Sequence, residues 1–127
     1  MLALSIVAPN GSRIASGQKT LEIRNWRPPK LPLRDLLIVE NKVFLHGEEQ
    51  SDADGIAVAL VGVDDVHAWL PAELKAACWA EWVPDLWAWQ VSHVRPIDGA
   101  FRVAARRKLY DEPISQALTE ELALLRG

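Results

Sequence analysis

The segment GQKTLEIRNW, residues 17–26, is the part of this 127-residue chain from which its fold can be worked out. Polar and apolar residues alternate in it with the period of a β-strand, so Leu21 and Ile23 are expected to face a core. The opposite face of the same strand then carries a carboxylate, a guanidinium and an indole, from Glu22, Arg24 and Trp26. Three groups that differ in charge and shape are therefore predicted to share one surface.

Lys19 precedes this strand and follows Gly17, at a predicted reversal of the chain. Residues 2–7 are expected to form a buried strand and residues 9–16 a short helix, which Gly17 would end because glycine readily adopts a left-handed backbone. The side chain of Lys19 is not bound by the alternation of the strand. Its ammonium group is therefore expected to join the polar face.

The spacing G-x-K-x-x-E-x-R, formed by Gly17, Lys19, Glu22 and Arg24, resembles the signature of the ASCH domains, a branch of the PUA-like superfamily of small β-barrels associated with RNA. Weaker similarities extend over most of the chain, at residues 5–9, 36–40, 55–66 and 89–94. The resemblance implies an α+β fold, a small PUA-like mixed β-barrel flanked by short helices, with residues 1–127 as a single domain. It also implies that Lys19, Glu22 and Arg24 line the polar pocket of the barrel.

The first functional hypothesis is a module that binds RNA, or a nucleoside or nucleotide derived from it. Glu22 can accept hydrogen bonds from the exocyclic amine of a base, and Lys19 and Arg24 can hold phosphate or carbonyl oxygens. Trp26 offers a flat ring on which a base can stack, or it packs as an ordinary apolar residue. The alternative for Glu22 and Arg24 is a surface ion pair of little energetic value.

Arg27 and Trp89 are two further predicted ligand contacts, each with a structural alternative. Arg27 opens a segment with three prolines, residues 27–32, which is expected to be a stiff surface loop that carries cations beside the motif, or a plain connector. Trp89 shares one face of a predicted strand with Trp87. Both rings can line either the cleft or the core, and the core is favoured.

The second hypothesis is an enzyme, because some small ASCH proteins are amidohydrolases that remove the acetyl group from 4-acetylcytidine and others act as ribonucleases. In such an amidohydrolase Lys19 would be the central catalytic group and Glu22 would pass a proton to the departing amine. Those amidohydrolases tend to carry threonine at the position of Glu22, and Glu81 is a candidate for their additional glutamate. A third hypothesis is a protein-interaction module whose cleft has no ligand. The protein is expected to be a monomer or a weak dimer.

The composition excludes several other kinds of site. A single cysteine, Cys78, allows neither an intramolecular disulfide nor a cysteine-based zinc site, and the histidines His46, His67 and His93 lack metal-ligand spacing. No metal and no cofactor is expected. The apolar run at residues 2–8 is too short for a signal peptide or a membrane span, so the protein is expected to be cytoplasmic without a membrane partner.

Charge is distributed unevenly along the chain. The net charge is −3, but residues 1–34 carry six basic groups and one acidic group, for a sum of +5. Residues 35–90 carry two basic and eleven acidic groups, for −9, and residues 91–127 carry six and five, for +1. Because local potential governs anion binding more than net charge, a phosphate-bearing ligand at the motif is electrostatically reasonable.

The remaining elements are predicted from hydrophobic patterns and turn residues. Residues 46–55 are expected to be a solvated loop without the ligand spacing of a calcium site. Trp79 and Trp82 are interpreted as packing residues of a helix that holds a buried, inert Cys78. The basic cluster at residues 106–108 can touch a phosphate backbone, but a solvated turn is the favoured interpretation. The expected elements are strands at 35–41, at 56–70 with a break at Gly62 or Asp64-Asp65, and at 87–96, a hairpin turn at Asp98-Gly99 into a strand at 100–105, and helices at 72–82 and 113–125.

Overall fold

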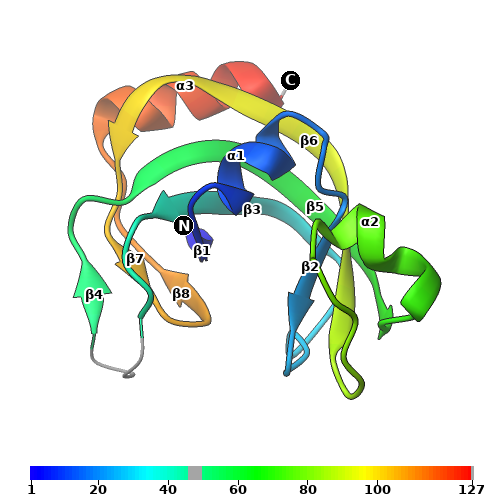
Figure 1. Ribbon diagram of the computed structural model, residues 1–127. Helices are drawn as coiled ribbons and strands as arrows, with labels where there is room; N and C mark the ends of the chain where they lie inside the picture. Colours follow the sequence, from blue (N-terminus) through cyan, green and yellow to red (C-terminus); the bar gives the residue numbers. More distant parts are fainter. Residues whose placement is uncertain (46–49, 127) are drawn as a thin grey trace.

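Eight strands and four helical segments make up the part of the chain that the structure, a computed structural model, describes: residues 1–45 and 50–126 (Figure 1). The helical segments are α1 (Asn10–Ala15), the 3-10 turn η1 (Pro71–Glu73), α2 (Leu74–Ala77) and α3 (Gln116–Arg126). The strands are β1 (Leu2–Val7), β2 (Leu21–Arg24), β3 (Leu33–Asn41), β4 (Ser51–Asp52), β5 (Ile56–Ala68), β6 (Trp87–Arg102), β7 (Ala105–Arg106) and β8 (Leu109–Asp111).

Six of the strands form one mixed sheet, in the order β2-β6-β5-β3-β1-β8, and β4 pairs with β7 in a separate two-stranded sheet. The pair β1 and β3 is parallel, and the other paired strands are antiparallel. The large sheet curls into an arch that resembles half of a barrel, with β2 at one edge and β8 at the other (Figure 1). This arrangement confirms the predicted α+β class, with a curled barrel-like sheet and short helices.

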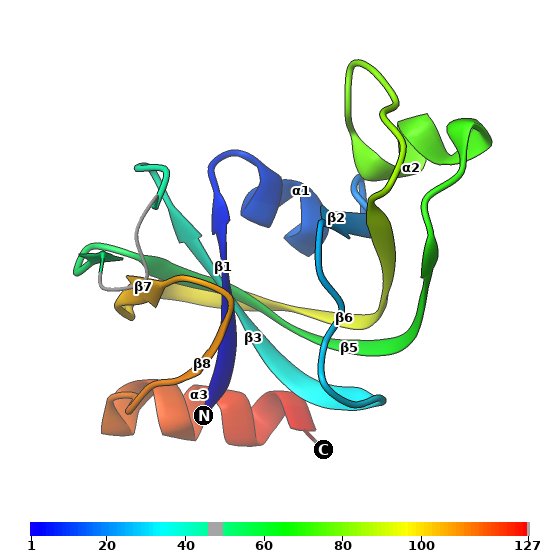
Figure 2. The same ribbon diagram turned by 90° about the horizontal axis from the view of Figure 1, so that it is seen from below.

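The two faces of β3 bury different side chains. Leu36 and Ile38 pack in one core cluster together with Ile14 of α1, whereas Leu37 and Val39 pack in a second cluster beneath α3. Successive residues of a strand point to opposite faces, so α1 and α3 cover opposite faces of the sheet, as Figure 2 also shows. The uninterrupted apolar run of this strand is explained by its burial on both faces.

The edge strand β2 is held by β6 on one side and by α2 from above. Leu21 and Ile23 are buried in a third apolar cluster with Trp69 and Ala77, so the predicted core-facing side of this strand is confirmed. Ala88, which is opposite Ile23 in the antiparallel register with β6, completes the cluster. Because these residues fix one face of β2, its other face is directed to the concave side of the arch.

The predicted hairpin at Asp98-Gly99 is wrong, because β6 is one strand of 16 residues that continues to Arg102. It pairs with β5 on both sides of these residues, at Ala57 and Phe101 and again at Ala59 and Pro96. The register therefore shifts there, and Gly99 has a φ of +96°. An Asp-Gly pair supplied the left-handed backbone of a bulge rather than of a tight turn.

The predicted helix over residues 72–82 is also shorter than expected. It begins at Pro71 as a 3-10 turn, continues as the four residues of α2, and ends at Cys78, whose φ of 57° is left-handed. Cys78 is therefore a half-buried residue at the helix end and not a buried residue in its middle. Everything after it, including Trp79 and Trp82, lies in the connection to β6.

Other expected elements agree with the structure. The strand at 2–7 and the short helix after Pro9 are observed. The break considered at Gly62 or Asp64-Asp65 is wrong, because β5 is one strand, Ile56–Ala68, with shifts of register on both sides of Gly62. The C-terminal helix begins slightly later than predicted and buries Leu118 and Leu122. Part of the expected loop at 46–55 lies outside the described residues. Among those that are described, no helix has the length and apolar character required to cross a membrane.

Candidate functional site

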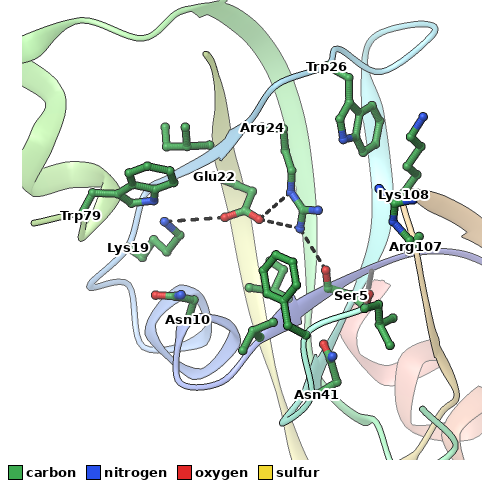
Figure 3. A pocket seen from close by; sticks show the side chains of 15 residues that line it. Ser5, Asn10, Lys19, Glu22, Arg24, Trp26, Asn41, Trp79, Arg107 and Lys108 are labelled. Carbon is green, nitrogen blue, oxygen red and sulfur yellow. Dashed lines mark hydrogen bonds and ion pairs between the residues drawn. The ribbon is translucent and has the colours of Figure 1, made fainter. Parts of the chain in front are cut away.

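A cleft of about 200 Å³ opens on the concave side of the sheet (Figure 3). The first half of the chain supplies most of its wall, and the segments after α2 and after β7 complete it. Figure 3 shows Lys19 and Trp79 at one end, Trp26, Arg107 and Lys108 at the other, and Glu22 and Arg24 between them. The lining residues are Ser5, Ile6, Val7, Asn10, Lys19, Glu22, Ile23, Arg24, Trp26, Asn41, Phe44, Leu45, Trp79, Arg107 and Lys108.

Lys19 reaches the cleft from the reversal between α1 and β2. Gly17 ends the helix with a φ of +84°, and the backbone N–H of Lys19 then donates to the carbonyl of Arg13 at 3.0 Å. The side chain is only 1% exposed, and its ammonium group donates to the carbonyl oxygen of Ala77 in α2. The amine is thus fixed between two helices rather than free in solvent.

Three charged groups are connected along the wall of the cleft. The ammonium nitrogen of Lys19 lies 3.6 Å from Oε1 of Glu22. The other carboxylate oxygen, Oε2, accepts from Nε of Arg24 at 2.9 Å and lies 2.7 Å from Nη2 of the same guanidinium. Nη2 also donates to the backbone carbonyl of Ser5 at 2.9 Å. The polar face predicted for β2 therefore forms a connected chain of alternating charges.

Burial lowers the pKa of Lys19 from its usual value. Removal of the ammonium from water is the largest cause, and the positive charge of Arg24 adds to it, whereas the negative charge of Glu22 acts in the opposite direction. Lys19 therefore loses its proton more easily near neutral pH than an exposed lysine does. Glu22, at 6% exposure, is the single carboxylate among the described residues that line the cleft.

Trp26 and Trp89 have different positions relative to the cleft. Trp26 is half-buried and forms part of the wall, and Trp89 meets it edge-to-face with ring centroids 4.9 Å apart. Nε1 of Trp89 donates to the backbone carbonyl of Trp26 at 3.2 Å. Trp89 itself is fully buried in the core, so it supports Trp26 from behind and does not form the wall.

Arg27, the other predicted ligand contact, is not among the residues that line the cleft. Its guanidinium lies 4.7 Å from the centroid of Trp87, over the ring, and the side chain is exposed. The loop that carries it has the irregular structure expected from its prolines. A cation–π contact at this position accounts for its orientation.

Three residues of the cleft were predicted to have other roles. Trp79 follows the early end of α2; it is 39% exposed and packs against Trp69 with ring centroids 5.1 Å apart. Arg107 and Lys108 form the turn between β7 and β8 and line the end of the cleft near Trp26. For Arg107 and Lys108, the signal in the sequence was the run of three cations at residues 106–108. Nothing in the sequence distinguished Trp79 from its neighbours.

Asn41, at the end of β3, is a further lining residue that the sequence did not single out. It is 2% exposed, and its amide nitrogen donates to the carbonyl of Val43. Its Oδ1 is buried without a hydrogen-bond partner within the described part of the chain. An acceptor in this state favours binding of a donor, because a buried polar group without a partner is costly.

A comparison with known protein families gives a match, and the matched range includes the residues that line the cleft. The model of the ASCH domain matches residues 4–112. The chain belongs to the ASCH family. A crystal structure of a tyrosine-to-phenylalanine mutant of ZmASCH from Zymomonas mobilis is similar to it with a TM-score of 0.54 and 15% sequence identity, covering 76% of this chain and 71% of the other. A search of curated proteins gives no match.

In this ASCH domain the signature residues are the ones that the fold brings together. Glu81, the candidate for an additional glutamate, is exposed in the connection after α2 and is not part of the cleft wall. Within residues 1–45 and 50–126, no group of three His, Cys, Asp or Glu side chains could hold a metal ion. The charged side chains that line the cleft are Lys19, Glu22, Arg24, Arg107 and Lys108.

Proposed function

We propose that this ASCH domain binds one nucleotide unit of RNA, or a nucleoside or nucleotide derived from RNA, in the cleft. The observation that carries the proposal is the connected chain of Lys19, Glu22 and Arg24 on a wall that also presents Trp26 and Trp79. A base has donors, acceptors and a flat face, and this wall offers partners for all three. The cleft volume of about 200 Å³ suits one small planar group rather than a larger cofactor.

Each group has a specific part in this recognition. Oε2 of Glu22 is held by Arg24 at hydrogen-bond distance, whereas the Lys19 ammonium lies 3.6 Å from Oε1, so Oε1 is the oxygen that can accept a hydrogen bond from an exocyclic amine. Oδ1 of Asn41 is a second acceptor, buried at the foot of the cleft. The half-buried ring of Trp26 and the exposed ring of Trp79 offer surfaces for stacking.

Binding of labelled single-stranded RNA, followed by fluorescence anisotropy, tests the proposal. Lys19→Met and Arg24→Gln are expected to weaken binding at least about tenfold, because each removes a charge-assisted hydrogen bond. Arg34→Gln is the matched control, since Arg34 is exposed and is not among the cleft residues. Circular dichroism verifies that each variant is folded. Equal affinity of all four proteins would contradict the proposal.

Hydrolysis of an acetylated base is the second candidate, and the lowered pKa of Lys19 beside Glu22 is the observation that favours it. A neutral amine at this position could activate water for attack on the acetyl carbon of 4-acetylcytidine. The C–N bond then breaks, the hydroxyl of water leaves with the acetyl group as acetate, and the exocyclic amine takes up a proton through Glu22.

The assay for this second candidate follows cytidine and acetate by chromatography after incubation of the protein with 4-acetylcytidine. Turnover must exceed that of Lys19→Met for the hydrolase to be accepted. Incubation with labelled RNA in parallel reports ribonuclease activity as shortened strands. Binding of RNA without turnover of either substrate supports the binding module over the enzyme.

A further inference from the structure

Arg107 and Lys108 form a second cationic site at the end of the cleft opposite Lys19 (Figure 3). We infer that this pair binds a phosphate, so that the ligand of the cleft is a phosphate ester of a nucleoside, either a nucleotide or a unit of an RNA strand, rather than a free nucleoside. This inference rests on the proposed function and assigns a different part of the ligand to each end of the cleft.

The turn that carries the two cations is held in place by its neighbours. Arg106, the last residue of β7, forms an ion pair with Glu112 at 2.8 Å, and its backbone carbonyl accepts from Oγ of Ser5 at 2.6 Å. Lys108 has a φ of 57°, and β8 begins directly after it and pairs with β1. The turn is therefore fixed to the wall of the cleft instead of extending into solvent.

The charges of Arg107 and Lys108 are not neutralised within the described part of the chain. The two neighbouring cations are neutralised, because Arg106 forms an ion pair with Glu112 and Arg24 forms one with Glu22. Within residues 1–45 and 50–126, no carboxylate forms an ion pair with Arg107 or Lys108, and the ammonium of Lys108 lies 5.9 Å from the ring centroid of Trp26. Two uncompensated cations beside a stacking surface are suited to a phosphate attached to a stacked base.

Ser5 sets the separation between the two ends. Its backbone carbonyl accepts from Arg24, and its hydroxyl donates to the carbonyl of Arg106, immediately before the cationic turn. A single residue of β1 thus contacts both Arg24, the partner of Glu22, and the residue before the turn that would hold the phosphate. This shared contact, within one cleft, is the reason for assigning both ends to the same ligand.

Isothermal titration of defined ligands tests the inference. The probes are the four ribonucleosides, their 3′- and 5′-monophosphates and a single-stranded RNA hexamer. For the base that binds best, the wild-type protein is expected to bind a phosphate-bearing form at least about tenfold more tightly than the nucleoside. The preference should decrease at higher salt concentration, because the site is open to solvent.

The double variant R107Q/K108Q is expected to lose this preference while it keeps the wild-type affinity for the nucleoside. The control Arg34→Gln, which removes one exposed positive charge outside the cleft, should retain the preference. Thermal melting checks the fold, and the single variants Arg107→Gln and Lys108→Gln replace the double variant if it does not fold. Preference for a mononucleotide indicates a terminal phosphate, whereas preference for the hexamer alone indicates a phosphate within a strand.

Two results overturn the inference: a wild-type protein that binds nucleoside and phosphate ester equally, or a preference that survives in R107Q/K108Q. Either leaves the proposed function intact if Lys19→Met and Arg24→Gln still weaken binding. If no nucleoside, nucleotide or RNA binds the wild-type protein, the proposed function and this inference both fail. Comparison of nucleosides with their phosphate esters therefore distinguishes an error in the phosphate site from an error in the proposed function of the cleft.

Discussion

Glu22 neutralises two cations at the cleft, and this makes it the residue whose charge matters most to stability. It is 6% exposed and lies 3.6 Å from the ammonium of Lys19 and 2.7 Å from the guanidinium of Arg24. Glu22→Gln keeps the shape but leaves two positive groups facing each other without a counter-charge. We expect a loss of about 3 kcal/mol in the free energy of unfolding, as for removal of one partner from a buried ion pair.

Urea denaturation at neutral pH measures this loss. Glu81→Gln is the matched control, because Glu81 is exposed and its substitution should change the free energy of unfolding by less than about 0.5 kcal/mol. A change for Glu22→Gln no larger than that of the control would mean that the ion pairs contribute nothing to the folded state.

Lys19 gives the stability of the protein a specific dependence on pH. Burial lowers its pKa in the folded state below the usual value of 10.5, so the unfolded chain binds its proton more tightly. Between the lowered pKa and 10.5 the folded state therefore binds fewer protons, and stability must increase as pH increases. The free energy of unfolding of the wild-type protein, minus that of Lys19→Met, should rise across this range.

Urea titrations from neutral pH to pH 10.5 provide the measurement, and the subtraction removes the other titrating groups. Lys19→Met retains the apolar stem and removes only the amine. A difference that falls with increasing pH would show that Glu22, and not burial, has the larger effect on the proton affinity of Lys19.

At the scale of single residues, the sequence predicted the positions that follow from local geometry. The period of a strand places Glu22 and Arg24 on one face, and Gly17 directs the chain so that Lys19 joins them. Trp79 and the Arg107-Lys108 turn could not be placed in this way. Their positions depend on where α2 ends and on which strand follows the turn, and both are set by contacts between distant segments.

At the scale of elements, the end of β5 is connected to η1 by a histidine. Nδ1 of His67 lies 2.6 Å from Asp65, and Nε2 lies 2.8 Å from Oε2 of Glu73. Hydrogen bonds to Asp65 first, and to Glu73 second, raise the pKa of His67 above 6.5. Glu73 also accepts from the backbone N–H of Leu70 at 3.0 Å, so the protonated ring stabilises the turn that leads into α2.

This contact should contribute to stability in acidic solution and lose its contribution as pH rises. The folded-state pKa is raised, so the stabilisation is fully present below 6.5 and disappears as pH increases through the raised value. The free energy of unfolding of the wild-type protein relative to His67→Gln should therefore decrease between pH 5.5 and 8.5. His93→Asn, which removes an exposed imidazole and tolerates a left-handed backbone, is the control for loss of a histidine.

Two errors in predicting the elements have the same physical origin. Asp98-Gly99 has the composition of a hairpin turn, but β5 offers pairing partners on both sides of it, so the left-handed glycine forms a bulge within a continuous strand. Residues 78–82 have the pattern of a helix, but Cys78 adopts a left-handed backbone where α2 meets β2. In both cases contact with a distant segment overrides the local preference: strand pairing with β5 in the first, and packing of α2 on β2 in the second.

At the scale of the whole molecule, the sequence predicted the fold class but not the order of the strands. Runs such as residues 36–39 indicate burial on both faces, which implies cover from two sides. They do not determine which helix covers which face, nor that β1 lies between β3 and β8. That order depends on contacts between residues far apart in the chain. It puts β2 and β8 at opposite edges of the sheet, and the curl of the sheet brings the β7–β8 turn to the cleft that β2 also lines.

The division of the molecule into two faces can be tested through α3. Leu122 is fully buried against the sheet, whereas Leu124 of the same helix is 79% exposed. Leu122→Ala should lower the free energy of unfolding by about 3 kcal/mol, because it leaves a cavity in the core. Leu124→Ala, the same substitution two residues away, should change it by less than about 0.5 kcal/mol. Neither residue lines the cleft, so RNA affinity per folded molecule should be unchanged in both variants. Weaker binding by folded Leu122→Ala would show that the packing of α3 controls the geometry of the cleft through the sheet, and that the two faces do not act independently.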